Sequence, residues 1–93
     1  MLRITVVESN ALAVTLRVEG RIAGPWVEEL RTTCNVHTSP DPIQLHLELE
    51  DVFFADAAGI AYLKGLRAQG VGLYHVTPFL RVLFKNDSSP DGS

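Results

Sequence analysis

The sequence lacks several features that define large classes of proteins. Cys34 is the only cysteine, so no disulfide can form within the chain, and a reducing compartment is expected. No apolar run approaches the roughly 20 residues that a membrane helix needs, and the first residues show no signal-peptide pattern. We therefore expect a cytoplasmic protein with no direct insertion into a membrane.

Concentrated positive charge is also missing. The eight Lys and Arg residues form no basic run, and the formal net charge is -3. Nucleic-acid binding depends strongly on positive charge that neutralises phosphates, so a nucleic-acid partner is not expected. The sequence has no glycine-rich phosphate loop of the Walker type either.

The size of the chain limits it to one domain. With 93 residues, of which 46% are hydrophobic, it can form a two-layer core but not two separate domains. We predict a single domain over residues 1–86 and a polar, disordered tail over residues 87–93.

Hydrophobic periodicity and turn residues predict four strands and three helices. The predicted strands are residues 3–7, 11–18, 43–50 and 71–76, and the predicted helices are residues 25–33, 57–69 and 78–85. Residues 35–42 contain two prolines and several polar residues, which indicates an exposed loop. This order predicts an α/β fold, with a four-stranded mixed sheet that begins with a hairpin and continues by βαβ crossovers. Because such crossovers are right-handed, the three helices should lie mainly on one face, and the alternation in residues 43–50 leaves the other face open to solvent.

The segment Phe53–Ile60 is the most informative part of the chain. It leads from the alternating strand into a predicted helix, and Asp56 stands where a helix N-cap belongs. Its carboxylate is expected to accept backbone N–H groups of Ala58 or Gly59. No residue of this segment has a hydroxyl group, so none can accept a phosphoryl group.

These elements together resemble the STAS family, the sulphate transporter and anti-sigma factor antagonist domain, over nearly the whole chain. The resemblance rests on Val18–Ile22 before the first helix, Leu47–Gly59 around the turn, and Val76–Pro78 at the start of the last helix. In bacterial antagonists the turn reads Asp-Ser-Ser-Gly or Asp-Ser-Ala-Gly, and a partner kinase phosphorylates the first serine. The resemblance implies that Ala57 occupies the position of that serine and that this chain lacks the phosphorylation switch.

The helix that follows Asp56 has an outward face of small residues. At ~100° per residue, one stripe is apolar and faces the sheet, while the opposite stripe is small and nearly uncharged. The small stripe consists of Ala58, Ala61, Gly65 and Ala68. Glycine inside a helix costs ~1 kcal/mol relative to alanine, so Gly65 reflects either a partner backbone that approaches closely or neutral drift.

Several other residues allow two interpretations. Phe53, Leu80 and Phe84 belong either to the core between the last helix and the sheet or to an apolar patch for a partner or a dimer. Trp26, near the start of the first helix, is ambiguous in the same way.

An enzyme would have to use Cys34 or a histidine. Cys34 and His37 fall at a helix end and in a loop, with no oxyanion motif nearby. His46 and Glu48 share one face of a strand, but two candidate ligands are a weak signal for a metal site. We therefore expect no catalytic residue, no metal and no cofactor.

The sequence thus predicts a non-catalytic protein-interaction domain that resembles an anti-sigma factor antagonist. By resemblance, the partner is an anti-sigma factor with a histidine-kinase-like ATPase domain, whose capture frees a sigma factor for transcription. The alternative is a STAS subunit of an ABC phospholipid-transport system, docked on the transporter ATPase. Self-association as a homodimer is left open. The predicted partner-binding residues are Asp56, Ala57, Ala58, Gly59, Ala61, Tyr62, Gly65 and Ala68.

Overall fold

The computed structural model describes residues 2–38 and 43–86, which contain four strands and three helices. The strands are β1 (Leu2–Ser9), β2 (Ala13–Ile22), β3 (Gln44–Ala55) and β4 (Gly72–Tyr74). The helices are α1 (Pro25–Thr38), α2 (Ala57–Ala68) and α3 (Pro78–Asn86). The predicted number and order of elements are confirmed, while the predicted tail, residues 87–93, lies outside the described residues.

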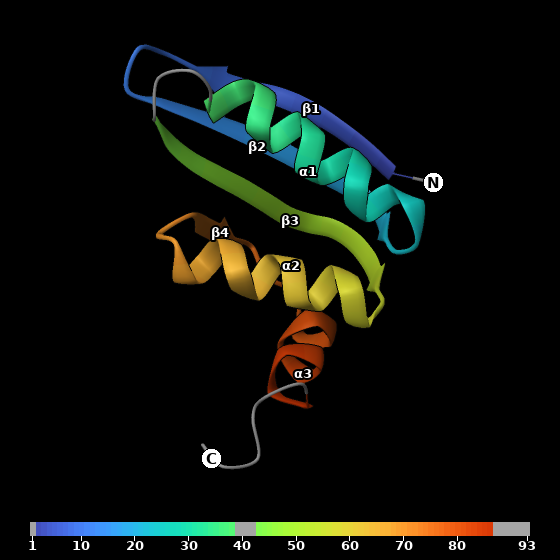
Figure 1. Cartoon of the computed structure of the whole chain (residues 1–93). Coiled ribbons are helices and arrows are strands. Elements are labelled where there is room, and N and C mark those ends of the chain that lie inside the picture. The colour runs from blue at the N-terminus through green and yellow to red at the C-terminus, as the bar shows by residue number, and fades with distance from the viewer. Residues whose placement is uncertain (1, 39–42, 87–93) are drawn as a thin grey trace.

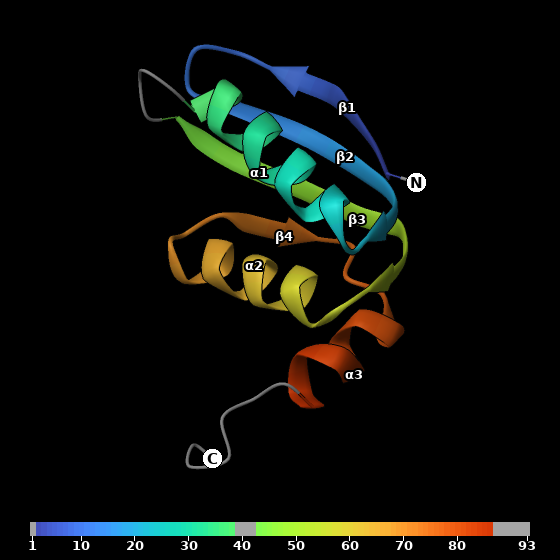
Figure 2. The same cartoon turned by 45° about the vertical axis from the view of Figure 1, so that its right-hand side comes forward.

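The strands form one mixed sheet in the order β1-β2-β3-β4. β1 and β2 are an antiparallel hairpin, and β2, β3 and β4 run parallel to one another. α1 and α2 lie on the same face of this sheet, as Figures 1 and 2 show from two directions. α3 contacts α2 and β3 and lies below α2 in the view of Figure 1. None of the helices in the described residues has the length and hydropathy that crossing a bilayer requires.

The alternation in β3 separates a buried face from a wetter one. Leu47 and Leu49 are fully buried on the face that α1 and α2 cover, whereas His46 and Glu48 are partly exposed on the other. On that second face, Arg17 Nε of β2 lies 3.5 Å from Glu48 Oε1. The predicted open, polar face of the sheet is therefore present.

β3 is longer than the sequence predicted, because two irregularities interrupt its alternation. The predicted strand ended at Glu50, but β3 continues to Ala55. At each register shift against β2, β3 advances one residue more than its neighbour. Leu49, Val52 and Ala55 all remain buried as a result, although they are three residues apart. A simple two-residue period cannot reveal a strand of this kind.

The hairpin turn and β2 also differ from the prediction. The Asn10 side-chain oxygen accepts the backbone N–H groups of Leu12, at 2.8 Å, and Ala13, at 3.0 Å, so the turn lies later than predicted and β2 starts at Ala13. β2 passes through Gly20, whose φ is 105°, and ends at Ile22. Glycine allows this left-handed backbone without ending the strand.

α1 and β4 have different lengths from those predicted. α1 extends to Thr38, where the prediction placed a loop, since Cys34 packs in the core and the Thr38 hydroxyl donates to the Cys34 carbonyl at 2.9 Å. The remainder of the predicted loop, residues 39–42, lies outside the described residues. β4 ends at Tyr74 because the next residue, His75, has a φ of 58°, which a strand cannot continue.

Candidate protein-interaction site

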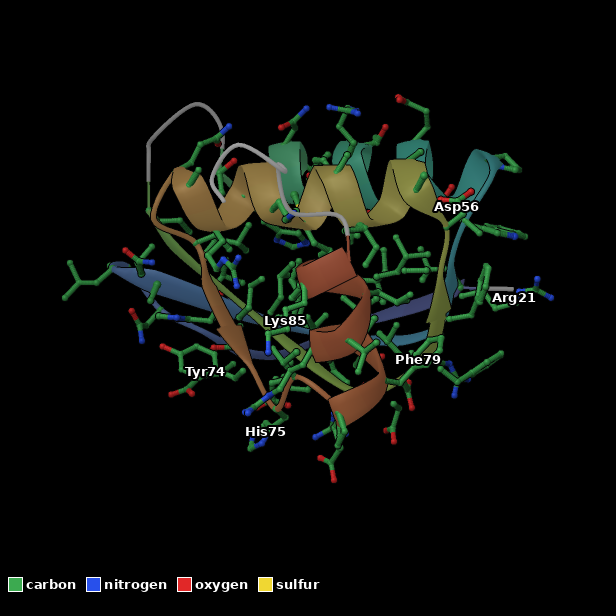
Figure 3. All side chains as sticks on the ribbon, turned by 90° about the horizontal axis from the view of Figure 1, so that it is seen from below. Arg21, Asp56, Tyr74, His75, Phe79 and Lys85 are labelled. Carbon is green, nitrogen blue, oxygen red and sulfur yellow. The ribbon has the colours of Figure 1, made fainter. Side chains whose placement is uncertain are left out.

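Asp56 joins the end of β3 to the start of α2 and uses both carboxylate oxygens. The backbone N–H of Gly59 donates to Oδ1 at 2.8 Å, which confirms the predicted N-cap. The backbone N–H of Gly24 donates to Oδ2 at 2.9 Å, so the same side chain ties down the loop between β2 and α1 (Asp56 is labelled in Figure 3). These N–H groups lower the pKa of Asp56 because they stabilise its charged form. Its carboxylate is therefore occupied within the chain.

Gly59 is buried in the first turn of α2 and does not lie on the exposed stripe. A Cβ atom at this position would overlap the carbonyl oxygen of Ile22, so α2 can approach the end of β2 only with glycine here. The backbone N–H of Asp56 donates to that same carbonyl at 3.2 Å. The role of Gly59 in the fold is therefore close packing against β2, while its predicted contact with a partner stays a prediction.

The small stripe of α2 is exposed to solvent. The four stripe residues are all exposed, and so is Ala57 at the start of the helix: Ala57, Ala58, Ala61, Gly65 and Ala68. A Cβ atom at Gly65 would meet nothing within 4 Å, so no contact in the described part of the chain requires glycine there. The stripe borders a shallow groove of about 440 Å³ between α1 and α2, which Arg31 and Tyr62 help to line.

Tyr62 forms a wall of this groove and is held from several sides. Its ring lies under the Arg31 guanidinium, which is 4.8 Å from the ring centroid, and Arg31 Nε lies 3.1 Å from Glu28 Oε2. Burial raises the pKa of the Tyr62 hydroxyl, and its hydrogen bond with the Cys34 thiol raises it further. Tyr62 therefore lines the groove, while its hydroxyl is engaged with Cys34 inside the molecule.

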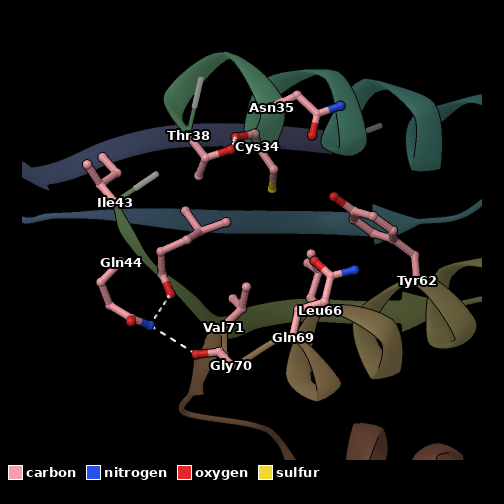
Figure 4. A pocket seen from close by; sticks show the side chains of 11 residues that line it. Cys34, Asn35, Thr38, Ile43, Gln44, Tyr62, Leu66, Gln69, Gly70 and Val71 are labelled. Carbon is pink, nitrogen blue, oxygen red and sulfur yellow. Dashed lines mark hydrogen bonds between the residues drawn. The ribbon is translucent and has the colours of Figure 1, made fainter. Parts of the chain in front are cut away.

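A second hollow, of about 320 Å³, lies between α1 and the C-terminal end of α2 (Figure 4). The Gln44 side chain lines this hollow, and its amide nitrogen donates to the carbonyls of Gly70, at 3.0 Å, and Leu45, at 3.3 Å. The Cys34 thiol faces this hollow, but burial raises its pKa, which disfavours the reactive thiolate.

The structure separates the apolar residues that the sequence left ambiguous. Leu80 and Phe84 are core residues, at 0% and 7% exposure. Phe53 is 65% exposed, because it lies at the second irregularity of β3, and Trp26 is 37% exposed. The Arg21 guanidinium lies 5.2 Å from the centroid of the neighbouring Phe54 ring. Phe53 and Trp26 therefore contribute exposed aromatic surface.

The residues that the sequence analysis considered for an enzyme lie at two separate places in the described part of the chain. Cys34 is buried, while His37 is in the last turn of α1. The ring centroids of His46 and Tyr74 lie 5.3 Å apart on the open face of the sheet, near the start of β3, whereas the Asp56 turn follows the other end of that strand. Within residues 2–38 and 43–86, no three His, Cys, Asp or Glu side chains are placed to hold a metal ion.

Comparison with known proteins identifies the fold. No protein-family model and no curated protein matches the sequence. The solved structure of the anti-sigma factor antagonist SpoIIAA, in its unphosphorylated form, matches with a TM-score of 0.66 at 19% sequence identity, over 89% of this chain and 82% of that one. The chain has a SpoIIAA-like fold. The STAS-like architecture predicted from the sequence is thereby confirmed.

A second solved structure agrees with this assignment. It is an uncharacterized protein of the DUF3478 family from Shewanella loihica, also with a SpoIIAA-like fold. It matches with a TM-score of 0.50 at 12% identity, over 77% of this chain and 61% of that one. At sequence identities this low, the structural match establishes the shared fold alone, so function must be argued from the site itself.

Proposed function

We propose that this chain is a non-catalytic protein-interaction domain that acts in the bacterial cytoplasm like an anti-sigma factor antagonist. The fold it shares with SpoIIAA supports this, as does the exposed stripe of small residues on α2. The observation that carries the proposal is Gly65, which is exposed and has open space where a Cβ atom would lie. A partner that packs closely against α2 would explain why a glycine stands at this helical position, which contacts within the fold do not explain.

The proposed mechanism is competitive occupancy without a phosphorylation switch. The exposed residue at the start of α2 is Ala57, whose methyl group cannot accept a phosphoryl group. By resemblance, Ala57 occupies the position that a partner kinase modifies in bacterial antagonists, so this chain stays in its binding form. The partner is an anti-sigma factor with a histidine-kinase-like ATPase domain, and its capture releases a sigma factor.

The test is affinity purification from the cells that produce the chain, with a matched pair of variants. Gly65→Leu adds a large side chain to the stripe, and Thr5→Leu adds the same side chain to an exposed position of β1. We expect wild type and Thr5→Leu to retain an anti-sigma factor with an ATPase domain, and Gly65→Leu to lose it. Retention of a transporter ATPase instead, or equal retention by both variants, would contradict the proposal.

The absence of a switch has its own test. Incubation of the wild-type chain with the captured kinase-like partner and ATP should leave its mass unchanged, whereas Ala57→Ser should gain one phosphoryl group. A phosphorylated peptide from the start of α2 in the wild type would show that another residue has replaced the switch. If Ala57→Ser gained no phosphoryl group, this would contradict the proposal that position 57 corresponds to the phosphorylated serine of bacterial antagonists.

A further inference from the structure

The segment from α2 to α3 carries charge of one sign. Residues 57–86 contain no aspartate or glutamate, although the whole chain has eleven. The same residues contain four of the eight Lys and Arg residues, which gives this span a formal charge of +4 in a chain whose net charge is -3. The cations are Lys64, Arg67, Arg81 and Lys85. They are too far apart in sequence to form a basic run, but the fold brings Arg67, Arg81 and Lys85 to one groove.

Three of these cations line one groove between α2 and α3. The groove has a volume of about 450 Å³, and its walls are Arg67, Arg81, Val82, Phe84 and Lys85. The Arg67 guanidinium lies 5.2 Å from the centroid of the Phe84 ring, which joins the two helices. Val82 is 55% exposed beside it. The groove therefore combines an apolar surface with a cationic rim.

The groove is distinct from the small stripe. Arg67 follows Gly65 by two residues, so the two lie on opposite sides of α2. The groove also involves α3, on which Lys85 and Phe79 project to opposite sides (Figure 3). A partner on the stripe would leave the groove available for a second contact.

We propose that this groove binds an acidic, amphipathic segment of a protein partner. Arginine pairs with carboxylates through two parallel hydrogen bonds, and lysine adds a further positive charge, so Glu and Asp side chains complement the rim. An apolar side chain of the segment packs against Val82 and Phe84. None of the described residues that line the groove is a carboxylate, so its walls do not repel an acidic ligand. A peptide chain can enter a concave groove, whereas a lipid bilayer contacts protruding surfaces.

The test uses the full chain and a fluorescent peptide of repeated Glu-Glu-Leu, with Glu-Glu-Ser and Lys-Lys-Leu peptides of the same length as controls. Fluorescence anisotropy should detect binding of the Glu-Glu-Leu peptide alone, and added salt should weaken it. The double variant Arg81→Glu and Lys85→Glu should bind at least roughly tenfold more weakly, because two favourable charge contacts become repulsive. The double variant Arg3→Glu and Arg21→Glu has the same net charge and should bind like wild type.

The outcomes separate this proposal from its alternatives. Equal weakening by both double variants would show that net charge alone drives binding, and equal binding of the Glu-Glu-Ser peptide would show that the apolar surface has no role. Binding of phosphatidylserine vesicles without binding of the peptide would replace the protein segment by a membrane. Because Gly65 lies outside the groove, Gly65→Leu should bind the peptide like wild type, so this test is independent of the proposed function. Loss of peptide binding in that variant would contradict the separation of the two surfaces.

Discussion

The two helical glycines of α2 should respond to the same substitution with opposite changes in stability. Gly65 is exposed, and a Cβ atom there would meet nothing within 4 Å. Gly59 is buried, and a Cβ atom there would overlap the backbone carbonyl oxygen of Ile22. The obstruction at Gly59 is main chain, so no side-chain rotation can relieve it.

The magnitudes follow from these two environments. Gly65→Ala should raise the free energy of unfolding by ~0.5–1 kcal/mol, because alanine loses less backbone entropy in a helix. For a domain of this size, that corresponds to an increase of about 2–8 °C in Tm. Gly59→Ala should lower the free energy of unfolding by ~1–3 kcal/mol, because α2 has to move away from β2 to make room for the methyl group.

Urea and thermal unfolding, followed by circular dichroism, measure both effects. Gly65→Ala serves as the control for helix propensity, so the difference between the two variants isolates the contact with Ile22. If Gly59→Ala stabilised the chain as much as Gly65→Ala does, α2 would not abut the end of β2, and the described geometry of the Asp56 turn would be wrong.

Four further predictions concern stability and reactivity. Asp56→Ala should lower the free energy of unfolding by ~1–2 kcal/mol at neutral pH, measured by urea unfolding, because it removes the acceptor of two backbone N–H groups. The N–H groups of Gly24 and Gly59 lower the pKa of Asp56. The contribution of Asp56 to the free energy of unfolding is therefore complete above the ordinary carboxyl pKa and is lost as the pH falls through the lowered value. Wild type should lose more stability than Asp56→Ala on acidification, and parallel plots of stability against pH would contradict this. The buried Cys34 thiol, whose pKa is raised, should react with a thiol reagent only after unfolding in urea, and rapid reaction of the folded chain would contradict its burial. Leu80→Ala should cost ~2–5 kcal/mol, since Leu80 is fully buried, and a loss below ~1 kcal/mol in the same unfolding assay would show that α3 is not packed on the core.

The sequence predicted the parts of the fold that depend on local chemistry. The N-cap at Asp56 was predictable because its partner, Gly59, is only three residues away. The β3 strand and its two unlike faces were predictable up to Glu50, where strict alternation ends. Both features are determined by residues close together in the chain.

The remaining features depend on contacts between distant segments. The extension of β3 to Ala55 requires two irregularities that only pairing with β2 reveals. The burial of Gly59 depends on Ile22, and the second bond of Asp56 depends on Gly24, which are both far away in sequence. The cationic groove is likewise invisible as a basic run, although the lack of carboxylates in residues 57–86 is a signal that sequence reading could have used.

The most direct test of the proposed interaction surface is hydrogen–deuterium exchange of the chain alone and in complex with its purified partner. The account predicts slower exchange of α2 and of the loop between β2 and α1 in the complex, with little change in β1. Protection confined to the open face of the sheet, with α2 unchanged, would contradict it.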